Sequence, residues 1–165
     1  MEDQEMQEAF LGYLYSMNFS GQEATLDEID SWVKSTKMDR GIFWKQYEGT
    51  IKADLIHFVQ DEATVRLTPK GTLHAEKSGL VPADNVSKNR EIRKKLVQTM
   101  AFHLTQKSAS IYVSDLAREA KITPEECIGN IYLLVEMGYA RWQVRSELVV
   151  ITTRVCGKSS AQAAA

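Results

Sequence analysis

Apolar residues near the N-terminus recur at spacings of three and four, namely Met6, Phe10, Tyr13, Leu14 and Met17. This is the period of an amphipathic helix. Asn18-Phe-Ser-Gly21 ends the pattern. We therefore predict a first helix from about Glu5 to Met17.

Two shorter helices should follow. Thr25 stands three residues before Glu28, a capping-box spacing that favours a helix start, and the apolar face of this helix holds Leu26, Ile29, Trp32 and Val33. Asp39 can cap a third helix. In that helix Phe43, Tyr47 and Ile51 line up, so we expect them to face inward.

The apolar period then changes from about 3.6 to 2. Leu55–Gln60 and Thr64–Leu67 are typical of two strands around the turn Asp61-Glu62-Ala63, which predicts a hairpin. Pro69 suits the first turn of a short helix through Ser78.

The second half repeats this order. Gly79–Ser87 breaks both periods, and a long helix is predicted over Lys88–Gln106. Val113–Ala120 predicts a short helix, and Thr123-Pro124-Glu125-Glu126 opens another that closes at Met137-Gly138. Two runs typical of strands follow, Tyr139–Arg145 and Leu148–Thr153.

The expected fold class is mainly α with small β-hairpins (α+β), in two domains of about 70–80 residues, each a three-helix core covered by a two-stranded sheet. We place the first domain at 1–80, a linker at 81–87, the second domain at 88–155 and a disordered tail at 156–165.

Both halves resemble the winged-helix superfamily. Ser114–Glu126 (SDLAREAKITPEE) is similar to its helix-turn-helix signature, and Leu133–Ala140 (LLVEMGYA) to its exit into the wing. Val65–Glu76 (VRLTPKGTLHAE) resembles the wing ending of MarR-like regulators. The resemblance implies two winged helix-turn-helix domains in tandem. Most winged helices bind DNA, and others dock proteins, so the fold leaves both functions open.

Charge is unevenly distributed along the chain although the net charge is −2. Residues 1–38 hold two lysines and eight acidic residues, whereas residues 86–118 hold seven basic residues and two acidic ones. Contact with nucleic acid should therefore centre on the middle of the chain.

The third helix of the first half has more side chains suited to base contact than the matching helix of the second half. Its outer face is expected to present four candidates for base or groove contact: Arg40, Lys45, Gln46 and Lys52. Trp44 at the flank can stack on a base or a partner, or pack against the N-terminal helix. The acidic wing tip Asp61-Glu62 argues against minor-groove insertion.

The matching helix of the second half is poorer, because its expected outward positions are Glu125, Gly129, Tyr132 and Glu136, beside Asn130. Phosphate contacts are expected instead from Lys88, Arg90, Arg93, Lys94, Lys95, Arg141 and Arg145. The run from Lys88 to Lys95 can equally be a solvated helix face, or dock on the acidic N-terminal segment.

No catalytic motif is found, and the histidines and cysteines lack ligand-like spacing, so we expect no enzyme, no metal site and no cofactor. No apolar run approaches the length of a membrane span, and the acidic N-terminus is unlike a signal peptide, which predicts a cytoplasmic protein.

The leading hypothesis is a transcriptional regulator that binds double-stranded DNA. The alternative is a protein–protein interaction adaptor in a larger assembly, with Trp44 or Tyr132 as the anchor, and a homodimer through the N-terminal helix is also open.

Overall fold

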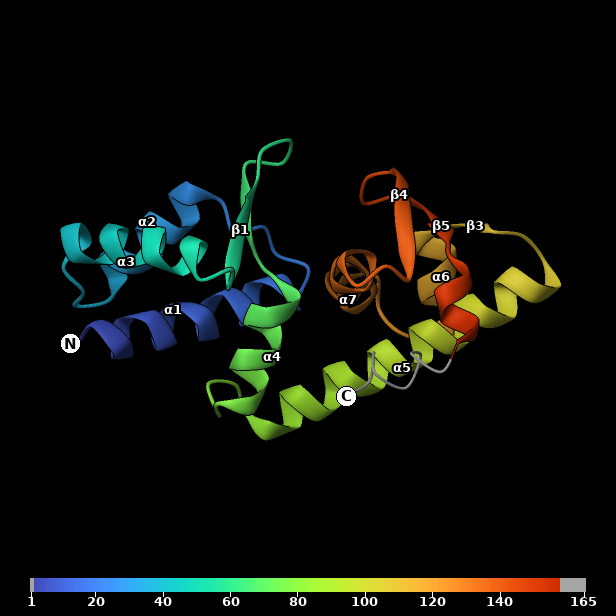
Figure 1. Ribbon diagram of the computed structural model, residues 1–165, viewed down its shortest axis with the longest axis horizontal. Helices are drawn as coiled ribbons and strands as arrows, with labels where there is room; N and C mark the ends of the chain where they lie inside the picture. The colour runs from blue at the N-terminus through green and yellow to red at the C-terminus, as the bar shows by residue number, and fades with distance from the viewer. Residues whose placement is uncertain (1, 158–165) are drawn as a thin grey trace. The chain divides into compact units, whose positions relative to one another are not determined.

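The computed structural model describes residues 2–157, which form two compact units. Taking only the described residues, unit 1 consists of residues 2–18 and 22–83, and unit 2 of residues 19–21 and 84–157. Over these described residues the chain is mainly helical with two small antiparallel sheets, which confirms the predicted α+β class (Figure 1). The residues 158–165 of the predicted tail lie outside the described residues.

Unit 1 contains α1 (Asp3–Asn18), α2 (Leu26–Ser35), α3 (Arg40–Lys52), β1 (Ile56–Val59), β2 (Thr64–Leu67) and α4 (Pro69–Lys77). Side-chain caps set the helix starts, as the sequence predicts. The Thr25 hydroxyl accepts from the Glu28 amide at 3.1 Å, and the Asp39 carboxylate accepts from the Ile42 amide at 2.9 Å. Thr68 caps α4 in the same way.

The core of unit 1 is built around α1, which contacts α3, α4 and β2. Phe10 is fully buried and meets the edge of Phe43 at a centroid distance of 5.0 Å, with Ile29 and Val33 of α2 also buried. Burying each such side chain stabilises the fold by roughly 1.5–3 kcal/mol. This packing fixes which face of α3 points outward.

One expectation for α3 is wrong. The sequence predicts that Ile51 faces inward, but it is 39% exposed, and Thr50 is fully buried in its place. A helix of 3.6 residues per turn brings position i+7 from Phe43 back to the same face more closely than position i+8. The Thr50 hydroxyl is satisfied because it donates to the Gln46 carbonyl at 2.7 Å.

Unit 2 contains α5 (Ala83–Gln106), β3 (Ser110–Tyr112), α6 (Val113–Ala120), α7 (Pro124–Glu136), β4 (Ala140–Val144), β5 (Leu148–Ile151) and a 3-10 turn at Thr153–Cys156. The long helix starts at Ala83 and not at Lys88, so most of the residues predicted as a linker are helical. Pro82 directly precedes this start, and Val86 is already buried.

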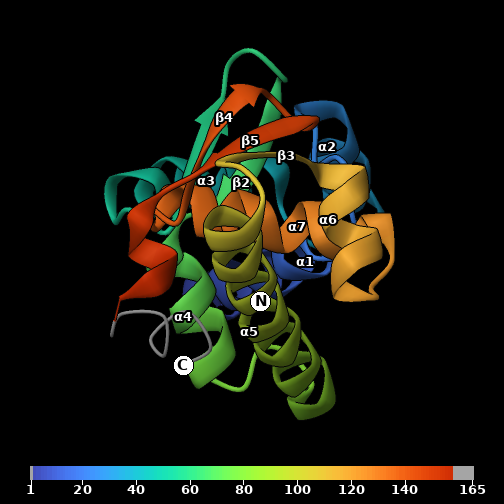
Figure 2. The ribbon, with the colours of Figure 1, turned by 90° about the vertical axis from the view of Figure 1, so that its right-hand side faces the viewer.

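The sheet of unit 2 has three strands in the order β3-β5-β4, which lie side by side in Figure 2. The sequence predicts the hairpin β4-β5 but not β3. Only Ile111 of β3 is buried, between exposed Ser110 and Tyr112, so three residues carry too little alternation to indicate a strand. The core beneath includes Leu96, Met100, Leu116, Ile131, Leu134 and Tyr139.

The two units share one order of elements, a long helix, two shorter helices and a hairpin. In unit 1 an isolated bridge before α2 takes the place of the strand β3 that precedes α6 in unit 2. Thr25 forms an isolated antiparallel bridge with Thr64, and the Val65 amide donates to the Ala24 carbonyl at 2.8 Å. This bridge holds the start of α2 beside the β1-β2 hairpin, so residues from both elements border one surface with α3.

Candidate functional site

The surface bordered by the third helix and the hairpin is the candidate site in each unit. In unit 1 the Phe43 anchor and the Asp39 cap orient α3, and its outward crest carries Lys45 and Lys52, both exposed. Gln46 is half-buried, and its backbone carbonyl is already bonded to Thr50.

Arg40, at the start of α3, is engaged within unit 1. Its guanidinium donates to a single carboxylate oxygen of Asp30 on α2, at 2.8 and 3.0 Å. Lys34 pairs with the same carboxylate at 2.9 Å. Hydrogen bonds from Lys34 and Arg40 hold the pKa of Asp30 below its ordinary value. Four side chains of α3 are predicted to contact bases. Two of them, Lys45 and Lys52, are exposed and form no ion pair with another described residue.

Trp44 stands at the flank of α3, half-buried. Its ring meets Phe43 and Tyr47 edge-on at centroid distances of 5.1 and 5.2 Å. It contributes to a hollow of about 440 Å³ whose wall comes from three elements: Leu26 of α2, Trp44, Tyr47 and Glu48 of α3, and Phe58 of β1. Burial raises the pKa of the Tyr47 hydroxyl on this wall.

The sequence does not identify Leu26 and Phe58 as site residues. It assigns Leu26 to the core face of α2, yet Leu26 is 40% exposed, and Phe58 is 38% exposed. Leu26 is the first residue of α2, and Phe58 stands near the far end of a four-residue strand, so both extend past the core. Their positions at element ends are the signal that could have indicated exposure.

In unit 2 the predicted outward face of α7 is wrong at two positions, and the neighbouring Asn130 is buried as well. Gly129 and Tyr132 are buried, and Asn130 is fully buried. The Tyr132 hydroxyl is 2.6 Å from Ser146 Oγ, and its ring lies 5.0 Å from that of Trp142. Tyr132 is therefore no exposed anchor, and Asn130 offers no amide to a base edge.

The basic residues between Lys88 and Lys95 on α5 have different environments. Lys88 forms an ion pair with Glu126 at 2.9 Å, and its hydrogen bond lowers the pKa of that carboxyl. Arg90 is half-buried. Lys94 and Lys95 are exposed. A run of charge in the sequence is spread around the helix because successive residues point in different directions.

Arg93 is predicted to contact phosphate and is buried instead, only 2% exposed. Its guanidinium donates to Asn130 Oδ1 at 3.3 Å, and the Asn130 amide in turn donates to Asn89 Oδ1 at 3.1 Å and the Glu126 carbonyl at 3.0 Å. These polar contacts tie α5 to α7. Arg93 thus has a structural role, since buried charge requires partners.

Arg141 and Arg145 are exposed on and just after β4, as the sequence predicts. Unit 2 also carries a hollow bordered by its third helix and hairpin, of about 480 Å³. Its wall comes from Tyr112, Val113, Ser114, Pro124, Glu125, Ile128, Ser146 and Glu147. Tyr112 is 54% exposed, and Glu125 and Glu147 are the charged residues of this wall.

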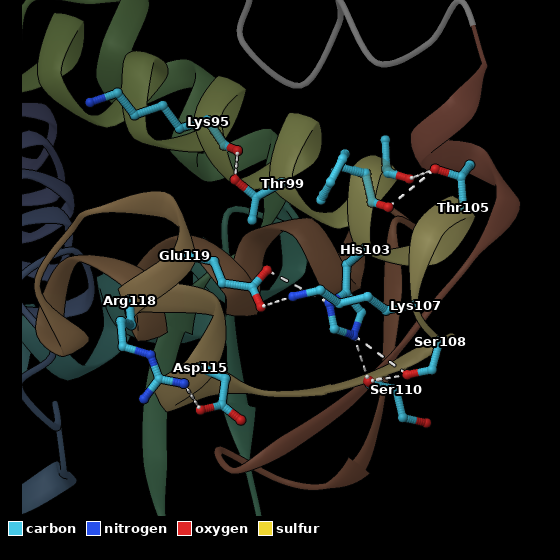
Figure 3. Close-up of polar contacts among 12 residues, drawn as sticks. Lys95, Thr99, His103, Thr105, Lys107, Ser108, Ser110, Asp115, Arg118 and Glu119 are labelled. Carbon is cyan, nitrogen blue, oxygen red and sulfur yellow. Dashed lines mark hydrogen bonds and ion pairs between the residues drawn. The ribbon is translucent and has the colours of Figure 1, made fainter.

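His103 is buried, and its environment is shown in Figure 3. Its Nε2 lies 3.1 Å from the Ser110 carbonyl, and its Nδ1 lies 3.6 Å from the Glu119 carboxylate, which also binds Lys107 at 3.1 Å. These contacts link α5 to β3 and α6. Among residues 2–157, no three His, Cys, Asp or Glu side chains are grouped so that they could hold a metal ion.

The two cysteines are free and have different environments. Cys127 is buried in α7, and burial raises the pKa of its thiol to about 12. Cys156 is exposed.

Comparisons with protein-family models, with curated proteins and with solved structures found no match to this chain. Over the part of the chain that the structure describes, no helix combines the length and apolar character needed to cross a bilayer.

Proposed function

We propose that this chain is a protein-docking adaptor built from two winged-helix units. One observation carries the proposal: in each unit the surface bordered by the third helix and the hairpin holds a hollow lined by apolar and carboxylate side chains. A winged helix that binds DNA places basic side chains on this surface, because phosphates attract cations.

The acidic residues near α3 strengthen this interpretation. Asp27 and Glu28 occupy the first turn of α2, and Asp61 stands in the hairpin turn. Carboxylates at these positions would repel the phosphates of a duplex bound along α3. Exposed apolar side chains beside them are instead typical of protein interfaces, where a few large anchors supply most of the binding energy.

DNA binding by a transcriptional regulator is the second candidate function, and it rests on Lys45 and Lys52 along the exposed crest of α3. Lys94 and Lys95 of α5, and Arg141 and Arg145 near β4, would add phosphate contacts. We rank it second because Arg93 is buried and hydrogen-bonded, and because Arg40 and Lys88 form surface ion pairs with carboxylates that a phosphate would have to displace.

Affinity purification of the tagged chain from its own cells, with nuclease treatment, tests the adaptor proposal. We expect a stoichiometric protein partner that survives the nuclease, and expect Leu26→Ala/Phe58→Ala to lose it. Leu73→Ala is the matched control, because Leu73 on α4 is 41% exposed and lies outside the hollow. Recovery of DNA alone would contradict the proposal, and equal recovery of the partner by both variants would show that the partner does not dock on the hollow of unit 1.

A further inference from the structure

The hollow of unit 1, defined by Leu26, Trp44, Tyr47, Glu48 and Phe58, has the features of a preformed anchor site. Its volume of about 440 Å³ lies at the small end of the roughly 300–1,000 Å³ found for ligand pockets. It therefore admits one or two large side chains and not the surface of a folded domain.

Contacts inside unit 1 support the wall of this hollow. The Trp44 ring contacts the rings of Phe43 and Tyr47 edge-on, and the Phe43 ring in turn packs against Phe10 in the core. Phe58 is held by the β1-β2 ladder, in which it pairs with Val65. Side chains that are already packed against one another lose little entropy when a ligand binds against them.

Acidic residues occur on each of the three segments that contribute to the wall of the hollow. Glu23 and Asp27 stand on either side of the Thr25 cap, Glu48 lines the hollow itself, and Asp61 is in the hairpin turn. The bridge between Thr25 and Thr64 brings the start of α2 and the end of this turn together. On α3 the basic residues Lys45 and Lys52 flank Glu48, three positions before it and four positions after it.

We infer that this hollow binds a basic segment of a partner protein, with a large apolar side chain as the anchor and Lys or Arg beside it. The inference rests on the docking function proposed above and specifies the chemistry of the partner. Apolar burial supplies the affinity, and the surrounding carboxylates select a cationic segment, because unlike charges attract and like charges are excluded. An acidic or phosphorylated segment would be repelled by Asp27 and Glu48.

The probe is a phage-displayed library of random 16-residue peptides, selected against the full chain. We expect the enriched peptides to combine net positive charge with at least one Leu, Ile, Phe or Trp. Titration calorimetry of one synthetic enriched peptide should then show at least tenfold weaker binding to Leu26→Ala/Phe58→Ala. Leu73→Ala should bind within twofold of the parent chain.

A charge-reversal double variant tests the contribution of the carboxylates to peptide binding. Asp27→Lys/Glu48→Lys should weaken the same peptide at least tenfold, whereas Asp3→Lys/Glu5→Lys, at the first turn of α1, should leave binding within twofold of the parent chain. Circular dichroism of every variant checks that its helices are retained.

Each other outcome overturns the inference, and the outcomes separate it from the proposed function. Enriched peptides that are acidic or neutral, yet are lost with Leu26→Ala/Phe58→Ala, would leave the docking function in place and refute the basic partner. Peptides that bind both double variants as tightly as the parent chain would show that the hollow is not their binding site. A selection that enriches nothing would also refute the inference, while the partner recovered after nuclease treatment decides the docking function separately.

Discussion

Three polar residues of unit 2 show that the local sequence alone does not predict the burial, and therefore the role, of a polar side chain. The sequence assigns Arg93, Asn130 and Tyr132 to a surface, yet each is buried and hydrogen-bonded within unit 2. Their polar groups are compatible with burial only because partners from other elements meet them. The side-chain partners of these residues stand 37, 41 and 14 positions away in the chain, so no local pattern could have revealed them.

The cysteines give a prediction at this scale. With its pKa raised to about 12, the Cys127 thiol is ionised in on the order of one molecule in ten thousand at pH 8. Because the thiolate is the reactive species, Cys127 should resist Ellman's reagent in the folded protein, while exposed Cys156 reacts.

Counting thiols spectrophotometrically checks this. We expect one fast equivalent under native conditions and two in denaturant. The variant Cys156→Ser removes the fast equivalent and serves as the control. Rapid modification of Cys127 in the native Cys156→Ser variant would contradict the buried environment of α7.

At the scale of elements, helix starts and strand periods could be predicted well, because short-range chemistry sets them. Thr25, Asp39 and Thr123 cap the helices that they are expected to open. The misplaced features need long-range information. β3 becomes a strand only because β5 pairs with it, and the start of α5 at Ala83 has no apolar period to mark it.

Two glycines of unit 1 provide a matched prediction about element packing. A Cβ on Gly71 of α4 would overlap the Leu55 carbonyl oxygen, whereas a Cβ on Gly49 of α3 would meet nothing within 4 Å. Gly71→Ala should therefore lower the free energy of unfolding by about 3 kcal/mol, the cost of overpacking. Gly49→Ala should raise it by about 0.5–1 kcal/mol, since alanine favours a helix over glycine.

Urea unfolding followed by circular dichroism measures both changes. A Gly71→Ala variant as stable as the parent chain would mean that α4 does not pack closely against the segment before β1.

At the scale of the whole molecule, the order of elements is repeated in two units, and this order could be predicted from the sequence. The chemistry of the candidate site could not. Four polar side chains on α3 suggest a DNA reader, but Arg40 is bound to Asp30, and the hollow beside Trp44 depends on Leu26 and Phe58, which come from separate elements. The end positions of Leu26 and Phe58 could indicate their exposure, but no single element indicates the hollow that they form with α3.

Binding to random duplex DNA, followed by fluorescence anisotropy as salt is varied, tests the central claim most directly. Each phosphate contact contributes about −0.9 to the slope of log affinity against log salt concentration. For a protein-docking adaptor we predict a slope near zero, or one unchanged by Lys45→Ala/Lys52→Ala. The contradicting result is a slope that corresponds to several phosphate contacts and whose magnitude falls by about 2 in this double variant. It would show that α3 lies on DNA and not on a protein.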